Sequence, residues 1–421
     1  MPLEPSSSQP KIVQKLLLRT AGFLLLMALV FGGMRYVQGR KGDYDNGGTS
    51  VGLVSAIQTE REGQKAVLIG ADGATKTTKT WKDGVNDREA VWSPDGKFLF
   101  FASDRAERTF HIFRWNPDAD DAEQRTLGAI SRGNPTFEPD ASDSLLVVAG
   151  GTVRELDPVT KKTPQILPPT SAEVAQGNDP EGSQGTQGAF SAAYGALGNS
   201  FRVARYFKDK TWIAAVMRRD EGELLVLQSL TMKEDRFPRP IPVIAGDRVD
   251  FDVNLKDGTV AFVVQNFRWP SADQIPPQYR KGNRITVPFR HVLGIVDPNT
   301  GTPQIVGAST DDKVAFGSPR VSPDGTRLLA VQGTMEEGGL RSKGMITMPY
   351  AAAGARSASP LAEGEVYEPS WSLDGARIVY VKRVGGKRDV FTMNADGSND
   401  ASLTKGKGDF SNPIFSPQAS K

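Results

Sequence analysis

The stretch EPSWSLDGARIVYVKRVGGKRDVFTMNADGSNDASL, residues 368–403, contains the parts of one complete repeat. Two segments in which apolar and polar residues alternate, 376–382 and 389–394, predict short β-strands. Glycine-containing turns precede, separate and follow these two segments. The pattern predicts an antiparallel, all-β unit. Because a single small sheet cannot bury both of its faces, we expect several copies of the unit in the chain.

Further copies are recognised by an aromatic residue and a Ser-Pro-Asp-Gly turn. WSPDG occurs at 92–96 and VSPDG at 321–325, and incomplete copies stand at 137–140 and 415–417. Ser-Pro-Asp-Gly suits a type I turn, since Pro presets the second position and Gly fits the fourth. The aromatic residues occupy one place in each copy and are predicted to face the core: Trp92, Phe137, Trp371 and Phe415.

The spacing of the copies indicates the architecture. Clear copies start at 92, 137, 321 and 371, and a repeat of about 40–50 residues with four strands is typical of a β-propeller blade. Two less regular copies are predicted between 137 and 321. Their expected strands are 201–207, 212–218, 224–230 and 241–245, then 250–254, 259–265, 291–296 and 304–306.

The repeat resembles that of a known family. WSPDGKFLFFASDR at 92–105, PSWSLDGARIVYV at 369–381 and VFTMNADGSNDASLT at 390–404 are similar to the repeat of TolB-type β-propellers. The resemblance is marked in three copies, partial in a fourth and weak between about 165 and 315. It implies a propeller fold and a binding role in the cell envelope. It does not name a ligand, because one fold serves many functions.

The two ends of the repeat region are predicted to complete one blade. AVLIGADGATK at 66–76 matches VFTMNADGSND at 390–400, so the strands at 51–58 and 65–69 are later strands of a blade whose first strand is missing. That strand is expected at 412–417. Closure of the ring in this way removes two exposed sheet edges. Seven blades are predicted, and six is the alternative that the TolB resemblance suggests.

Composition excludes some classes of function. The 51 basic and 49 acidic residues leave a net charge of +2, which gives no reason to expect a nucleic acid partner. The chain has no cysteine, so disulfides and thiolate metal sites are excluded. No cofactor is predicted.

The N-terminal region predicts a membrane anchor. We expect a disordered cytoplasmic tail at 1–15, a transmembrane helix at 16–37, a linker at 38–50 and the propeller at 51–421. Twenty-two helical residues span about 33 Å, enough for a bilayer core. A cleaved signal peptide is the alternative, but no suitable cleavage site follows the apolar run.

The orientation of this anchor is not determined by charge. Three basic residues stand on each side of the apolar run, which is a tie under the positive-inside rule. The TolB resemblance favours a single-pass protein with its propeller outside the cytoplasm, in the periplasm or at the cell surface.

Three insertions point to a binding face. They lie at 168–198, 267–284 and 332–343, and the connections that carry them emerge on one face of a propeller, opposite the Ser-Pro-Asp-Gly turns. The second insertion interleaves aromatic and basic residues, which is typical of interface anchors. The candidate partner-binding residues are Phe267, Arg268, Trp269, Tyr279, Arg280 and Lys281. The alternative is that the aromatic residues fold back over the adjacent blade.

Catalytic and metal signals are weak. The two histidines, His111 and His291, are each predicted at the start of a strand, where a lone histidine is usually structural. The acidic groups at 118–123 and 394–400 are interpreted as solvated turns rather than calcium loops. No metal and no catalytic residue is therefore predicted.

The sequence thus predicts a non-enzymatic, membrane-anchored propeller. Its role would be protein binding or scaffolding, with an envelope protein or a cell-wall component as partner. One alternative is a carboxylate-based hydrolase, such as a glycosidase or a calcium-dependent lactonase, with its acidic groups at the central channel. Another is a sensor that binds a small ligand in that channel.

Overall fold

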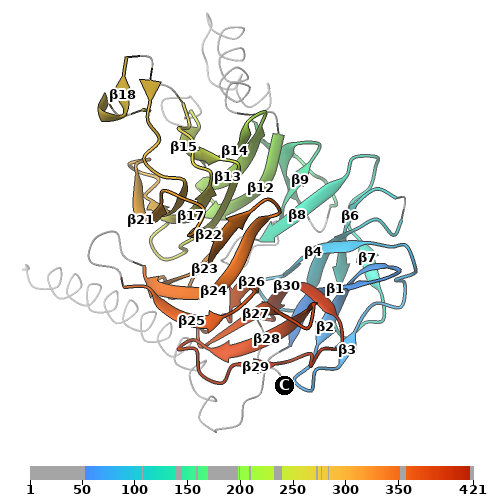
Figure 1. Ribbon diagram of the computed structural model, residues 1–421. Coiled ribbons are helices and arrows are strands. Elements are labelled where there is room, and N and C mark those ends of the chain that lie inside the picture. Colours follow the sequence, from blue (N-terminus) through green and yellow to red (C-terminus); the bar gives the residue numbers. More distant parts are fainter. Residues whose placement is uncertain are drawn as a thin grey trace, which may run out of the picture. The chain divides into compact units, whose positions relative to one another are not determined.

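A computed structural model describes residues 53–417 except 107, 138–144, 158–159, 169–197, 199, 208–209, 232–238, 272–273, 276, 283 and 351–356. These residues form seven four-stranded antiparallel sheets, which are the blades of a β-propeller (Figure 1). In the described ranges no helix has the length and apolar character needed to cross a bilayer. The predicted anchor at 16–37 lies outside them.

The first three blades, with strands named from the innermost to the outermost, cover the N-terminal part of the propeller. Blade 1 contains β30 (Asp409–Phe415), β1 (Val54–Glu60), β2 (Gly63–Ile69) and β3 (Thr75–Lys76). Blade 2 contains β4 (Asp87–Trp92), β5 (Leu99–Ser103), β6 (His111–Trp115) and β7 (Ala122–Gln124). Blade 3 contains β8 (Arg132–Phe137), β9 (Leu145–Ala149), β10 (Thr152–Leu156) and β11 (Gln165–Leu167).

The other four blades follow in chain order. Blade 4 contains β12 (Ser200–Phe207), β13 (Trp212–Arg219), β14 (Gly222–Ser229) and β15 (Ile241–Gly246). Blade 5 contains β16 (Arg248–Val253), β17 (Val260–Gln265), β20 (His291–Val296) and β21 (Pro303–Ser309). Blade 6 contains β22 (Ala315–Val321), β23 (Arg327–Glu336), β24 (Gly339–Pro349) and β25 (Ser359–Glu363). Blade 7 contains β26 (Val366–Trp371), β27 (Arg377–Val384), β28 (Lys387–Asn394) and β29 (Ala401–Ser402).

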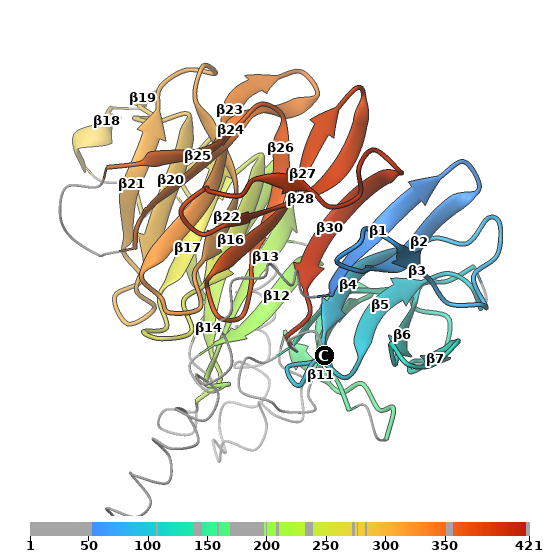
Figure 2. The same ribbon diagram turned by 90° about the horizontal axis from the view of Figure 1, so that it is seen from below.

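The ring closes as the sequence predicts. Strand β30 pairs antiparallel with β1, and Val54 stands opposite Phe415. In Figure 2 the red β30 lies beside the blue β1. The N-terminal strands and the C-terminal strand therefore share blade 1. The prediction of seven blades is confirmed, and both irregular blades lie where the sequence placed them.

The hydrophobic core is divided among the blade interfaces. The described residues contain seven clusters of buried apolar side chains, and each cluster joins two neighbouring blades. Trp92, Trp371 and Phe415 are buried, as predicted. Phe137 is half-buried and packs edge-to-face on Phe100 with ring centroids 5.1 Å apart. Apolar contacts between the facing sides of neighbouring blades thus stabilise the ring.

The first strand of a blade begins earlier than its sequence pattern suggests. The aromatic residue stands at the end of that strand, so β26 starts at Val366 rather than near Trp371. A register shift between first and second strands breaks the alternation in six of the seven described blades. Residues with positive φ mark five of these bulges: Glu89, Asn134, Ser318, Glu368 and Asn412.

The Ser-Pro-Asp-Gly turns are built as expected. The backbone N–H of Gly325 donates to the carbonyl of Ser322 over 2.8 Å, and Gly325 has φ of 71°. The Ser322 hydroxyl donates to the carboxylate of Asp324 and accepts the N–H of Arg327. The serine and aspartate side chains thereby lock the turn between the first two strands.

One of the three insertions differs from the expectation. Most of 332–343 is paired strand, because β23 and β24 extend as one long hairpin with a two-residue connection, Glu337–Gly338. Cross-strand hydrogen bonding therefore orders a segment that resembles a loop in composition. The insertion at 168–198 lies almost entirely outside the described residues.

We expect the closing strand to make a large contribution to stability. Phe410 of β30 is fully buried in the cluster between blades 7 and 1. Phe410→Ala should lower the free energy of unfolding by about 3–5 kcal/mol, because it removes buried apolar surface and leaves a cavity. Chemical denaturation measures this change. Leu373→Ala, at an exposed turn position, should change it by no more than about 0.5 kcal/mol.

The turn at 322–325 predicts a specific pH dependence. The hydrogen bond from the Ser322 hydroxyl holds the pKa of Asp324 below its ordinary value of 3.8, and the bonds from Thr326 act in the same direction. Since the folded-state pKa is the lower one, the ionised carboxylate stabilises the fold above the ordinary pKa. That contribution is lost as pH falls through the lowered value.

Ser322→Ala should raise the pKa of Asp324 toward its ordinary value, as measured by NMR titration of its carboxyl carbon. Asp95, whose own pKa is lowered in the turn of blade 2, serves as the control and should titrate as before. An unchanged titration of Asp324 in this variant would show that the hydroxyl is not the cause.

Candidate binding site on the blade 5 insertion

The insertion between β17 and β20 folds over the outer strand of the preceding blade. The backbone N–H of Arg268 donates to the carbonyl of Ala245 in β15 over 2.8 Å. The Gln274 side chain donates to the Pro242 carbonyl over 2.8 Å. These bonds tie a blade 5 connection to the edge of blade 4 and explain why the insertion has a defined course.

The three predicted aromatic residues lie together. Phe267 is 8% exposed and belongs to the core cluster between blades 4 and 5. Trp269 packs on it edge-to-face at 5.1 Å between centroids, and Tyr279 lies 5.4 Å from Trp269. Trp269 and Tyr279 are half-buried. The aromatic residues thus fold back over the blade, which is the packing alternative, and Trp269 and Tyr279 keep part of their surface exposed.

The three predicted basic residues separate into two places. Arg268 forms an ion pair with Asp247 at 2.5 Å, beside blade 4. Arg280 and Lys281 form β18, which pairs with β19 (Arg284–Ile285) in a small hairpin that projects from the blade in Figure 1. Both side chains of β18 are exposed. The structure therefore brings Arg268 near the aromatic group and places the other two basic residues on the hairpin.

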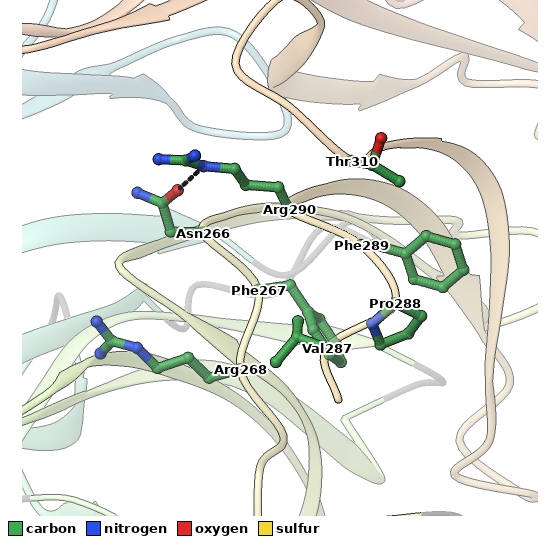
Figure 3. A pocket seen from close by; sticks show the side chains of 8 residues that line it. All are labelled: Asn266, Phe267, Arg268, Val287, Pro288, Phe289, Arg290 and Thr310. Carbon is green, nitrogen blue, oxygen red and sulfur yellow. Dashed lines mark hydrogen bonds between the residues drawn. The ribbon is translucent and has the colours of Figure 1, made fainter. Parts of the chain in front are cut away.

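A surface hollow with a volume of about 460 Å³ lies at the base of the insertion. Its lining residues are Asn266, Phe267, Arg268, Val287, Pro288, Phe289, Arg290 and Thr310. Figure 3 shows the apolar side chains of Phe267, Val287, Pro288 and Phe289 grouped together, with Arg268 and Arg290 extending beyond them. Val287 is 48% exposed. The hollow therefore offers an apolar floor with two cations beside it.

A continuous polar chain holds the two arginines. Asp247 accepts from Arg268 and from the Asn266 amide nitrogen, and the Asn266 oxygen accepts from Arg290 Nε over 3.1 Å. Arg290 Nε also lies 2.8 Å from Asp312. This network fixes the cations, and it leaves Arg268 Nη1 without an acceptor among the described residues. Each aspartate forms an ion pair with one arginine of the rim.

His291 belongs to the same hydrogen-bond network and is buried beneath the hollow. It is fully buried, at the first position of β20 as predicted, and its Nδ1 accepts the backbone N–H of Asn266 over 3.3 Å. Nε2 therefore carries the proton and donates to Asp312 over 3.0 Å. This assigned tautomer gives His291 a structural role beneath the hollow. His111 begins β6 in a different blade.

The sequence prediction missed several of the residues that line the hollow. The predicted insertion ended at 284, whereas Val287, Phe289 and Arg290 come later. The sequence carried one signal for them, because Phe267-Arg268 is followed by a second pair, Phe289-Arg290. The two pairs face each other, since the N–H of Phe267 donates to the carbonyl of Arg290 over 2.7 Å.

Acidic residues in the loops at 118–123 and 394–400 form ion pairs or hydrogen bonds with other side chains of the protein. Asp120 pairs with Lys79 at 2.7 Å, and Glu123 pairs with Arg114 at 2.7 Å. Asp396 accepts from Ser398, and Asp400 accepts from Tyr380. Among the described residues, no three acidic or histidine side chains are arranged to hold a metal ion.

Comparisons with known proteins support the fold. No family model matches the chain. An oligogalacturonate lyase solved with manganese is 12% identical, with a TM-score of 0.50 over 83% of this chain and 84% of that one. TolB from Acinetobacter baumannii is 15% identical, with a TM-score of 0.49 over 88% and 68%. A chain from a study of two prolyl endopeptidases is 14% identical, with a TM-score of 0.49 over 83% and 48%.

At these identities, the likeness to the lyase concerns the fold alone. The β-propeller implied by the repeat resemblance is confirmed by the seven four-stranded sheets of the described chain. A likeness of fold alone does not choose among functions, because one fold serves many of them.

The packing of the three aromatic residues predicts that Trp269 stabilises the small hairpin of β18 and β19. Trp269→Ala should loosen β18 and β19, because the indole contacts both Phe267 and Tyr279 and such pairs are worth about 0.5–1.5 kcal/mol each. Hydrogen exchange would report it at Thr286, whose N–H donates to the Tyr279 carbonyl over 2.9 Å. Val384→Ala, at an exposed site in blade 7, should leave that exchange unchanged.

Proposed function

We propose that the protein is a membrane-anchored, non-enzymatic propeller that binds another envelope protein, or a cell-wall component, through the blade 5 insertion. The observation that carries this proposal is the apolar surface hollow bordered by Arg268 and Arg290. The likeness of the repeat to that of TolB-type propellers supports a binding role.

The chemistry of the hollow fits an apolar side chain next to acidic groups. Phe267, Val287 and Phe289 provide apolar contact area, and guanidinium groups beside such a surface are well suited to bind carboxylates. The segment 266–290 contains five basic residues and one acidic residue. Ile285 and Val287 are both about half-exposed, which gives the insertion apolar surface available to a partner.

The carboxylates of the inner strands favour a scaffold over a hydrolase. A hydrolase would need acidic groups that are available at the channel. Glu89 and Glu368 instead accept the backbone N–H groups of Asn134 and Asn412 in the next blade, over 2.5 and 2.6 Å. Asp87 is buried, accepts the backbone N–H of Ala66 in blade 1 over 3.0 Å and pairs with Arg105 at 2.7 Å. These carboxylates hold blades together, which supports a structural role for them.

The proposed location follows from the N-terminal sequence. The apolar segment at 16–37 would anchor the propeller in a membrane, with the propeller outside the cytoplasm. The insertion face would then be free to meet partners of the envelope. A cleaved signal peptide would give the same compartment without the anchor.

Site-specific photocrosslinking tests the proposal in the native cells. A photoreactive amino acid at Val287 of the full-length protein should capture a specific envelope partner, identified by mass spectrometry. The same amino acid at Leu373 is the matched control, because Leu373 is 60% exposed but lies in a turn between first and second strands, on the opposite face. We expect no such adduct there.

Further outcomes would separate the alternatives. Adducts with cytosolic proteins from Val287 would contradict the outward orientation. Equal adducts from both positions would show that the insertion has no special role. Absence of any partner at Val287, with the protein intact, would reject the proposal in favour of an enzyme or a small-ligand sensor.

A further inference from the structure

Three arginines gather on one side of the interface between blades 2 and 3. Arg132 stands opposite Ala149 in β9, and Ala149 stands opposite Thr152 in β10. Arg154, two residues after Thr152, therefore shares the sheet face of Arg132. This face meets blade 2, because Val147, two residues before Ala149, packs in the cluster that joins the two blades.

Blade 2 contributes the third arginine. The guanidinium of Arg88 lies 3.6 Å from the centre of the Phe110 ring. The carbonyl of the same Phe110 accepts the backbone N–H of Arg132 over 2.8 Å. Gly133 has no side chain, and a Cβ there would lie 2.6 Å from Glu89 Oε2 and 3.4 Å from Arg88 Nη2. Arg88 and Arg132 thus both contact Phe110.

One carboxylate, that of Glu89, lies beside this group of three arginines. Arg132 is 8% exposed, and its one side-chain hydrogen bond within the described chain goes to the Ile130 carbonyl. Arg154 donates to Thr152 and to the Thr163 carbonyl. Neither forms an ion pair with a described residue. Glu89 is 3.8 Å from Arg88 and already accepts the N–H of Asn134.

Two donors of the group have no acceptor. Nε of Arg88 and Nε of Arg132 are both buried and make no hydrogen bond to the described residues. Burial and the neighbouring charge of Arg154 both lower the pKa of Arg132. A buried cation without a counter-ion is costly, and buried charges in proteins are normally paired. An oxyanion would satisfy the donors and neutralise the charge together.

We propose that Arg88, Arg132 and Arg154 form a binding site for an oxyanion, the phosphate or carboxylate group of a small ligand. Guanidinium groups match both anions through paired N–H donors. The site opens to solvent through Arg88, whose side chain is 41% exposed, and through the half-buried Arg154. It lies in blades 2 and 3 and does not depend on the partner proposed for the blade 5 insertion.

Thermal unfolding and calorimetry of the full-length, detergent-solubilised protein test this site. Inorganic phosphate and citrate are the probes, each compared with chloride at equal ionic strength. We expect at least one of them to raise the unfolding midpoint and to bind measurably. A response to phosphate alone would indicate that the ligand binds through a phosphate group. A response to citrate alone would indicate a carboxylate group.

Two variants make the test specific. Arg132→Met should lose the response to the anion, with affinity lower by at least about tenfold, because a charged hydrogen-bonding group is removed. Its unfolding midpoint in chloride should be equal to or above that of the wild type, because an unpaired buried cation is removed. Arg154→Met should weaken the same response.

Arg383→Met is the matched control. It removes a half-exposed cation that pairs with Glu365 in blade 7, so the response to the anion should persist. The proposal is overturned if neither probe acts on the wild type beyond chloride. It is also overturned if Arg132→Met keeps the response, or if that variant unfolds at a lower midpoint in chloride, because Arg132 would then already have an anionic partner within the chain.

Discussion

The pairing of β30 with β1 is the constraint on which the other blades depend. It joins parts of the chain as far apart as Ser55 and Ile414, whose hydroxyl and carbonyl lie 3.4 Å apart across 359 positions. Without it, blade 1 would lack its inner strand and blade 7 would present an uncovered face. Since each core cluster is shared by two blades, closure is what gives every blade two neighbours.

Hydrogen bonds between inner strands join neighbouring blades in addition to the apolar clusters. Glu89 and Glu368 each reach the backbone of the next blade at a bulge. Asp252 accepts the N–H of Val321 between blades 5 and 6, although its own strand has no bulge. A bulge leaves a backbone N–H without its ladder partner, so a carboxylate there satisfies a donor that would otherwise be unpaired. These three carboxylates of the inner strands therefore join neighbouring blades.

The blade 5 insertion shows how packing and exposure coexist in one segment. Phe267 is part of a core cluster and also lines the hollow, so its burial supports the surface on which a partner would bind. The network from Arg268 to Asp312 holds the rim from both strands that bear the insertion. A preformed apolar surface beside fixed charges costs little ordering on binding, which is favourable for affinity.

Local sequence patterns were sufficient to predict the repeat, the ring closure, the turns and the blade count. Each of these depends on periodicity or on a short motif, such as Ser322 to Gly325, which acts within a few residues. The same patterns could not locate the first residues of the inner strands, because bulges at Glu89 and Glu368 interrupt the alternation.

Contacts between segments that are distant in the sequence determined the structures of the insertions. Strand pairing converted 332–343 into a hairpin, and contacts with blade 4 placed the aromatic residues of 267–279. The grouping of Arg88, Arg132 and Arg154 is likewise invisible in the sequence, where they are up to 66 positions apart. Side chains from different blades meet only when the ring closes, and no local pattern carries that information.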